Sequence, residues 1–305
     1  MRLFLSFLTL AALLLPGAGR AADLTIDAAS SFLVDATING HAVRLRVDPA
    51  ASGYIILNPE TVARIGLRPS MLRSATRIGP VRLTGSSKVA EVAIGGVTGD
   101  RRLVWIDRPA VEGADGLIGP ADMPYDRVIF TLGAPRGGEA TAVLPMEFAR
   151  GAGLSFPRRL GEDVVRIQFS LIKPESMATA GAGALIAAAH GGGWIGEVRE
   201  QPIEFGVSRP VRAMWLERPV DLGYFQFRQF LVRTGDHRGN LDLPPEPDAD
   251  PDEVVVTGGS RQRAIFALKL GLDRLSQCSR LVWDNGTRRL TLNCTNLLPT
   301  RPPTP

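Results

Sequence analysis

The sequence predicts a mostly β protein with short helices, built as two related halves. Short apolar and β-branched runs alternate with turn-forming Gly, Asn and Pro residues along the chain. Between Phe32 and Leu132, no stretch has the length and periodicity of a long amphipathic helix. The order of strands, turns and short helical stretches in the first half also recurs, weakly, in the second half.

The N-terminus has the layout of a secretory signal peptide. Arg2 precedes an apolar run from Leu3 to Leu15, and small residues surround Arg20. The apolar run is shorter than the about 20 residues that span a bilayer. We therefore expect residues 1–21 to be removed and the mature chain, without a membrane span, to be periplasmic or secreted. An uncleaved N-terminal anchor is the alternative.

The composition argues against a nucleic-acid partner. Hydrophobic residues make up 45% of the chain, which supports a substantial core, and the net charge is +4. Almost all cationic side chains are Arg and are scattered, whereas a nucleic-acid site concentrates them on one face. Lysine occurs only at Lys88, Lys173 and Lys269.

The first half, residues 22–150, contains most of the regular pattern. Asn39-Gly40 separates two strands, and a second turn runs from Asp48 to Gly53. A short helix is expected next, because Asn58 can cap it, Pro59 suits its first position and Gly66 can end it. Strands are predicted at Phe32–Ile38, Ala42–Val47, Tyr54–Leu57, Val81–Leu83, Val89–Ile94, Leu103–Ile106 and Arg127–Leu132.

The second half, residues 151–298, is less regular. Thr179 to Gly183 is interpreted as a small-residue turn. The acidic, Pro-rich stretch at 244–253 is predicted to be a disordered insert, and residues 299–305 a loose tail. Strands are predicted at Val164–Ile172, Pro202–Val207, Val211–Leu216, Phe225–Val232 and Val254–Thr257.

Cys278 and Cys294 are expected to form a disulfide. They flank two β-prone runs joined by Asn285-Gly286, the strongest short hairpin signal. Folding the chain at this turn brings the cysteines nearly opposite each other. In the chain-entropy model such a bridge contributes about 3 kcal/mol.

Two matches carry the internal repeat. The first aligns Val47–Ile56 with Met177–Ile186 and places Asp48 opposite Ala178. The second aligns Gly116–Gly119 with Leu268–Gly271.

The first half resembles the aspartic proteases of the retroviral and pepsin type. The resemblance rests on the hairpin leading into Val47-Asp48-Pro49-Ala50-Ala51-Ser52, on the helical stretch Pro59–Leu67 and on Ala114–Gly119. It implies a two-lobed acid-protease β-barrel fold with a cleft between the lobes. It also implies a catalytic role for Asp48 and a substrate-covering flap, for which the Leu83–Val89 segment is the candidate.

The expected site departs from that family. Its chemistry needs two carboxylates that share a proton, and Ala178 leaves Asp48 without a partner. Pro49 lacks the hydroxyl that the family has at this position. The substrate-binding candidates are Ser52, Gly53, Thr179 and Gly85.

These features favour an exported pseudo-protease that binds an extended peptide or a partner protein. One alternative is an active aspartic endopeptidase, as a homodimer or with an acid such as Asp115 or Asp122 replacing the missing one. The other is a structural envelope protein. No cofactor or metal is expected, because His41, His190 and His237 are isolated in the sequence and no phosphate-loop motif is present. The absence of a Gly-x-Ser-x-Gly motif argues against a serine hydrolase of that type.

Overall fold

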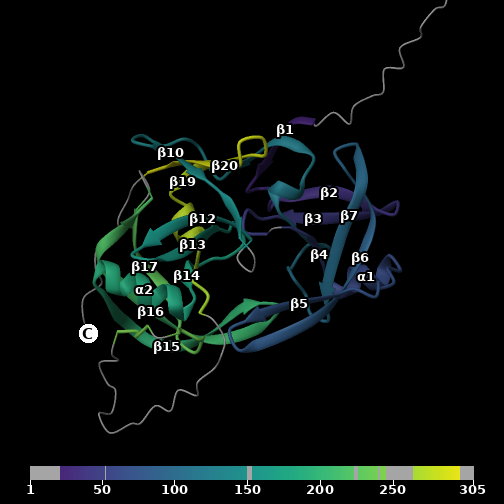
Figure 1. The fold of residues 1–305 in the computed structure, drawn as a ribbon. Coiled ribbons are helices and arrows are strands. Elements are labelled where there is room, and N and C mark those ends of the chain that lie inside the picture. The colour runs from purple at the N-terminus through teal and green to yellow at the C-terminus, as the bar shows by residue number, and fades with distance from the viewer. Residues whose placement is uncertain are drawn as a thin grey trace, which may run out of the picture.

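A computed structural model describes residues 21–51, 53–149, 153–222, 226–239, 241–244 and 264–295. Within these ranges the protein is mostly β, as the sequence predicts (Figure 1). Several predictions lie outside the described residues. They concern nearly all of the expected signal peptide, Ser52, residues 245–253 of the insert, the Val254–Thr257 strand and the 299–305 tail. No helix in the described part has the length and apolar character that crossing a membrane would require.

The first lobe is a seven-stranded sheet that closes on itself. Its strand order is β2-β3-β8-β4-β7-β6-β5, and an additional pairing of β2 with β6 joins strands that are far apart in that order. Helix α1 (Pro59–Arg64) begins with the expected Pro. The strands are β2 (Leu33–Ile38), β3 (His41–Val47), β4 (Ile55–Leu57), β5 (Arg73–Ile78), β6 (Val81–Ile94), β7 (Val97–Ile106) and β8 (Gly116–Ile118).

The second lobe repeats this arrangement. Its order, β12-β13-β18-β14-β17-β16-β15, is that of the first lobe strand for strand, with β11 added at one edge. The parallel pairs β3–β8 and β4–β7 correspond to β13–β18 and β14–β17. The strands are β11 (Glu147–Ala149), β12 (Gly153–Leu160), β13 (Asp163–Phe169), β14 (Met177–Ala178), β15 (Gly192–Glu204), β16 (Val207–Asp221), β17 (Gln226–Arg233) and β18 (Ala267–Leu270).

A five-stranded sheet joins the two lobes. Its order is β1-β9-β19-β20-β10, so strands from the beginning and the end of the described chain belong to one sheet, with β9 between them. Two short helices, η1 (Pro120–Asp122) and α3 (Leu272–Leu275), precede β9 and β19. The strands are β1 (Ala21–Asp27), β9 (Tyr125–Thr131), β10 (Ala140–Pro145), β19 (Cys278–Asp284) and β20 (Arg289–Cys294).

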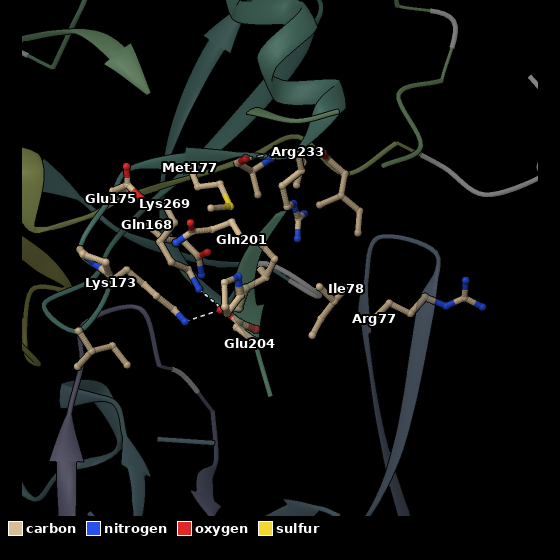
Figure 2. Close-up of a pocket in the computed structure, with 17 residues that line it drawn as sticks. Arg77, Ile78, Gln168, Lys173, Glu175, Met177, Gln201, Glu204, Arg233 and Lys269 are labelled. Atoms are coloured by element: carbon tan, nitrogen blue, oxygen red, sulfur yellow. Dashed lines mark hydrogen bonds and ion pairs between the residues drawn. The ribbon is translucent and has the colours of Figure 1, made fainter. Parts of the chain in front are cut away.

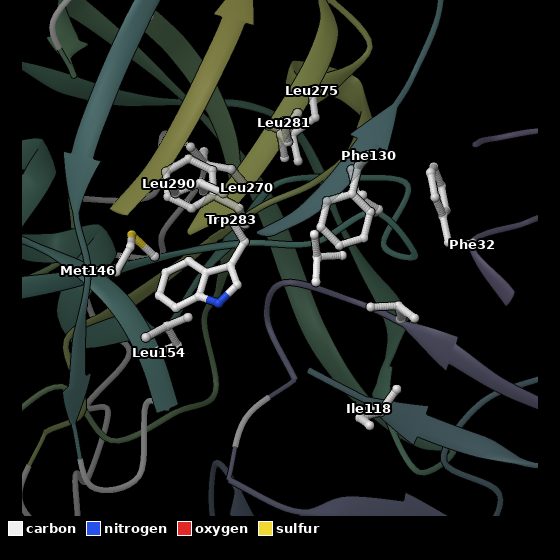
Figure 3. Packing of buried hydrophobic residues seen from close by; sticks show 14 of the residues in the cluster. Phe32, Ile118, Phe130, Met146, Leu154, Leu270, Leu275, Leu281, Trp283 and Leu290 are labelled. Atoms are coloured by element: carbon white, nitrogen blue, oxygen red, sulfur yellow. The ribbon is translucent and has the colours of Figure 1, made fainter. Parts of the chain in front are cut away.

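The core is continuous across this sheet. Phe130 of β9 and Leu281 of β19 are fully buried, and Trp283 is 2% exposed (Figure 3). They belong to the same cluster as Ile118 in the first lobe and Leu270 in the second. The lobes therefore share one hydrophobic core.

The predicted hairpin and disulfide near the C-terminus are confirmed. Strands β19 and β20 pair around the Asn285-Gly286 turn, with Cys278 directly opposite Cys294. The two sulfurs are bonded. The disulfide therefore links two neighbouring strands of the central sheet, β19 and β20.

Two local predictions are wrong. The predicted strands Val81–Leu83 and Val89–Ile94, and the flap candidate Leu83–Val89 between them, form the single continuous strand β6. The hairpin turn is instead at Gly79-Pro80, between β5 and β6. The Pro202–Val207 strand is interrupted by a turn at Phe205-Gly206, where both residues have positive φ. Both lobes thus carry a long hairpin, β5–β6 and β15–β16.

The small-residue turn expected at Thr179–Gly183 is instead the start of helix α2 (Ala180–His190). A Cβ added at Gly183 would lie 2.5 Å from Val232 of β17, so the missing side chain lets the helix pack closely on the sheet. The helix is buried on most sides and therefore lacks the amphipathic stripe by which sequence analysis recognises helices.

Candidate functional site

Asp48 lies directly after β3, at the turn between that strand and β4. Its N–H donates to the carbonyl of Ile118 at 3.0 Å, and its own carbonyl accepts from the Ala51 N–H at 2.9 Å. The residue is 2% exposed. The backbone therefore fixes the carboxyl group in the interior, facing the second lobe.

The second lobe engages both oxygens of this carboxyl group. The Ser170 hydroxyl donates to Oδ2 at 2.8 Å, and the Leu171 N–H donates to Oδ1 at 2.8 Å. Burial raises the pKa of Asp48, while the Leu171 N–H, the charge of Lys269 and the Ser170 hydroxyl act in the opposite direction. Asp48 thus forms a buried, hydrogen-bonded link between the lobes.

Ser170 is the structural counterpart of Asp48. Asp48 follows β3 and Ser170 follows β13, which are equivalent strands. The Ser170 N–H donates to the carbonyl of Leu270 at 2.8 Å, as the Asp48 N–H does to Ile118. This register agrees with the sequence match of Gly116–Gly119 to Leu268–Gly271.

The predicted match of Asp48 with Ala178 is therefore a misalignment. Ala178 pairs with Leu268 in β18, as Leu57 pairs with Gly116 in β8, so Ala178 corresponds to Leu57. The error has the same origin as the missed helix, because the small residues after Ala178 resemble a turn. The position opposite Asp48 nevertheless carries no acid, since serine occupies it.

The two other acids considered have different partners. Asp122 accepts from the Gly53 N–H at 2.9 Å, and burial raises its pKa. Asp115 accepts from the Arg44 N–H at 2.8 Å and pairs with Arg64 at 2.5 Å. Asp122 thus shapes the turn after Asp48, and Asp115 anchors α1.

The predicted substrate-binding residues do not gather at one place. Gly53 has a positive φ of 78°, and its Cα faces the ring of Phe148. Gly85 is inside β6, where an added Cβ would lie 2.1 Å from the Trp105 carbonyl, so its Cα is packed against β7. Thr179 caps α2 by accepting from Ala182 at 3.3 Å, and it also lines a cavity.

That cavity lies between the end of β5 and the second lobe, and its volume is about 350 Å³ (Figure 2). Asp48 is not among its lining residues. Lys269 pairs with Glu204, and the ammonium group of Lys173 donates to the Ile203 carbonyl. The lining residues are Arg77, Ile78, Gln168, Ile172, Lys173, Pro174, Glu175, Met177, Thr179, Gln201, Pro202, Ile203, Glu204, Arg233, Ile265, Ala267 and Lys269.

The charges in this cavity influence one another. The positive charge of Lys269 lowers the pKa of Glu204 to about 2, with a further contribution from Lys173. Burial lowers the pKa of Lys173, and Lys269 adds to that effect while Glu204 opposes it. Sequence reasoning did not select these residues, although two of the chain's three lysines meet here.

The closed first lobe, its repeated partner and the central sheet define a two-lobed, mostly β fold with Asp48 at the junction. Residues 34–120 match the family model described as aspartyl protease, and this range includes Asp48. The resemblance to the aspartic proteases is thereby confirmed, and the family match lies in the first lobe.

Comparison with solved structures finds aspartic proteases. The aspartic proteinase from Irpex lacteus has a TM-score of 0.42 and 12% sequence identity, over 86% of this chain and 94% of that chain. The EIAV protease, complexed with the inhibitor HBY-793, has a TM-score of 0.24 and 19% identity, over 28% of this chain and 79% of its own. A comparison with curated protein sequences finds no match.

Proposed function

We propose that this is an exported pseudo-protease that binds an extended peptide, or such a segment of a partner protein, without cleaving it. The match of residues 34–120 to the aspartyl protease family supports the architecture. The apolar N-terminal sequence, Leu3 to Leu15, supports the proposed export.

The environment of Asp48 is the observation that carries the proposal. Aspartic-protease chemistry needs one carboxylate to activate water and a second acid to protonate the substrate carbonyl. Opposite Asp48 is the hydroxyl of Ser170, which does not titrate as a carboxyl does. Both oxygens of Asp48 accept hydrogen bonds from the second lobe, and little of the residue is exposed to water or substrate.

The same contacts argue against a homodimeric active site. A second copy of Asp48 would have to replace Ser170 and Leu171 of the same chain, which already cover the carboxyl group. That replacement would open a junction where Asp48 and Leu171 are each 2% exposed.

The cavity between the end of β5 and the second lobe, which we call the cavity beneath β5, supports the proposed peptide binding. Its walls combine apolar side chains such as Ile78 and Met177 with amides and charged groups, which can contact both the apolar and the polar parts of a peptide. The neighbouring edge strands β5 and β15 have backbone groups that an extended peptide could pair with.

A cleavage assay tests the proposal. The mature protein is incubated with a peptide mixture from acid to neutral pH, with and without pepstatin, next to the Asp48→Asn variant. We expect no cleavage by either protein. Pepstatin-sensitive cleavage that Asp48→Asn abolishes would establish the active endopeptidase instead.

A peptide array then separates binding from a structural role. Retention of peptides by the folded protein supports the binding function. A protein that neither cleaves nor retains any peptide would be assigned to the structural envelope class.

A further inference from the structure

The cavity beneath β5 has enough volume to hold a side chain of a bound peptide. Its volume of about 350 Å³ is at the small end of ligand sites. The first lobe contributes Ile78 at the end of β5, and the second lobe contributes the opposite wall (Figure 2). A peptide between the lobes can therefore place a side chain here.

The cationic groups of the cavity outnumber its available carboxylates. Lys269 pairs with Glu204, and the Arg233 guanidinium pairs with Asp236 at 2.7 Å. Glu175 is bound to Arg199 at 2.7 Å. No described carboxylate forms an ion pair with Lys173.

Lys173 has hydrogen-bonding capacity for a ligand. An ammonium group has three donors, and the Ile203 carbonyl is the one acceptor recorded for it among the described residues. Figure 2 shows the side chains of Lys173 and Lys269 both extending toward Glu204. Glu204 forms its ion pair with Lys269, whereas Lys173 donates to the backbone carbonyl of the neighbouring Ile203.

We propose that this cavity binds a carboxylate of an extended peptide, held by the ammonium group of Lys173 beside the Lys269–Glu204 pair. The inference rests on the proposed peptide-binding function and adds its ligand class, an acidic peptide. Because Lys173 is partly buried, a charge-assisted hydrogen bond there is stronger than at a fully exposed site. The burial that lowers the pKa of Lys173 is a cost that a bound anion would offset.

Paired peptides test this inference. Each peptide retained on the array is resynthesised with Glu, Gln or Lys substituted at one position at a time, and with a free or an amidated C-terminus. Their affinities are measured by fluorescence anisotropy on the full mature protein. At one position we expect the Glu peptide to bind on the order of tenfold more tightly than its Gln counterpart.

Variants of Lys173 test whether its ammonium group causes the preference for the Glu-containing peptide. Lys173→Met should remove the preference for the acidic peptide, and Lys173→Glu should reverse it in favour of a Lys-containing peptide. Lys88→Met is the matched control, because Lys88 is exposed on β6 and does not line the cavity. Circular dichroism confirms that each variant is folded.

The possible outcomes distinguish a failure of this inference from a failure of the proposed peptide-binding function. Equal binding of Glu and Gln peptides, with amidation also without effect, overturns the inference and leaves peptide binding intact. A loss confined to amidated peptides identifies the carboxylate as the chain terminus and supports the proposed chemistry. Absence of binding by every peptide overturns the proposed function and the inference together.

Discussion

At the scale of single residues, the carboxyl group of Asp48 serves as a structural link. It accepts a hydroxyl and an N–H from the second lobe at 2.8 Å each. A buried acceptor that is hydrogen-bonded to two donors contributes to the stability of the fold, mainly because its removal would leave both donors unpaired.

Asp48→Ala should therefore destabilise the protein. The Leu171 N–H and the Ser170 hydroxyl would lose their acceptor in the interior, at a cost of about 2–4 kcal/mol. Urea unfolding measures the change. Asp100→Ala, at an exposed position on β7, is the control and should change stability by less than about 0.5 kcal/mol. Equal effects of the two substitutions would contradict a linking role.

Ser170→Asp would create the carboxylate pair that the protein lacks. Two carboxyl groups at hydrogen-bonding distance cannot both ionise, so one pKa in the folded state rises above its unfolded value. The folded variant then holds a proton that the unfolded chain releases at neutral pH, so its stability should increase as the pH falls from 7 to 4.

Urea unfolding at several pH values checks this expectation, with Ser170→Asn as the uncharged variant of similar size. The difference between Ser170→Asp and Ser170→Asn should be largest at pH 7 and shrink toward pH 4. A difference independent of pH would show that the two carboxyl groups do not interact.

At the scale of elements, the β5–β6 hairpin is held against the second lobe at its tip. Gly79 has a φ of +58°, and an added Cβ would lie 2.2 Å from Oδ1 of Asp236. Asp236 is itself fixed by Arg233 at 2.7 Å and is almost fully buried. The hairpin can therefore approach this closely only with glycine at its tip.

Gly79→Ala should separate the hairpin tip from the second lobe. The added methyl group must displace Asp236 from Arg233, so we expect faster amide exchange in β5 and in the adjoining part of β6. Gly96→Ala is a matched control, because Gly96 has a φ of +79° but no atom within 4 Å of the added Cβ. Both substitutions place a side chain at a positive φ, which costs about 1 kcal/mol. Unchanged amide exchange in Gly79→Ala would exclude the contact between the hairpin tip and Asp236.

Elements with local signals were predictable from the sequence, and those that depend on tertiary packing were not. The strands around Asn39-Gly40, helix α1 and the Cys278–Cys294 hairpin have turn or cap residues that determine them locally. Helix α2 was missed because its Gly and Ala residues are selected by close packing on β17.

The candidate site was predictable only in part for the same reason. The surroundings of Asp48 indicated its turn, but its partner Ser170 is 122 residues further along the chain. Identifying that partner requires the register of β13 and β18, which no local pattern specifies.

At the scale of the whole molecule, the central sheet makes the lobes interdependent. Strand β9 pairs with β1 on one side and with β19 on the other, and Val128 and Phe130 of β9 are fully buried. Removing the second lobe would expose both the strand edge and this apolar face to water.

A fragment of residues 22–132 should therefore not fold cooperatively alone. We expect it to lack a sharp thermal transition in near-ultraviolet circular dichroism and to associate in size-exclusion chromatography. The full mature chain should show a single transition under the same conditions. A monomeric fragment with its own sharp transition would show that the lobe is independent of the central sheet.

The order of pairing in this sheet also affects biosynthesis. The ribosome releases β9 well before β19, because all strands of the second lobe lie between them in the sequence. Until β19 emerges, the nascent chain presents an unpaired hydrophobic edge, the kind of surface that aggregates or recruits a chaperone. Native assembly must therefore wait for translation of the last hairpin.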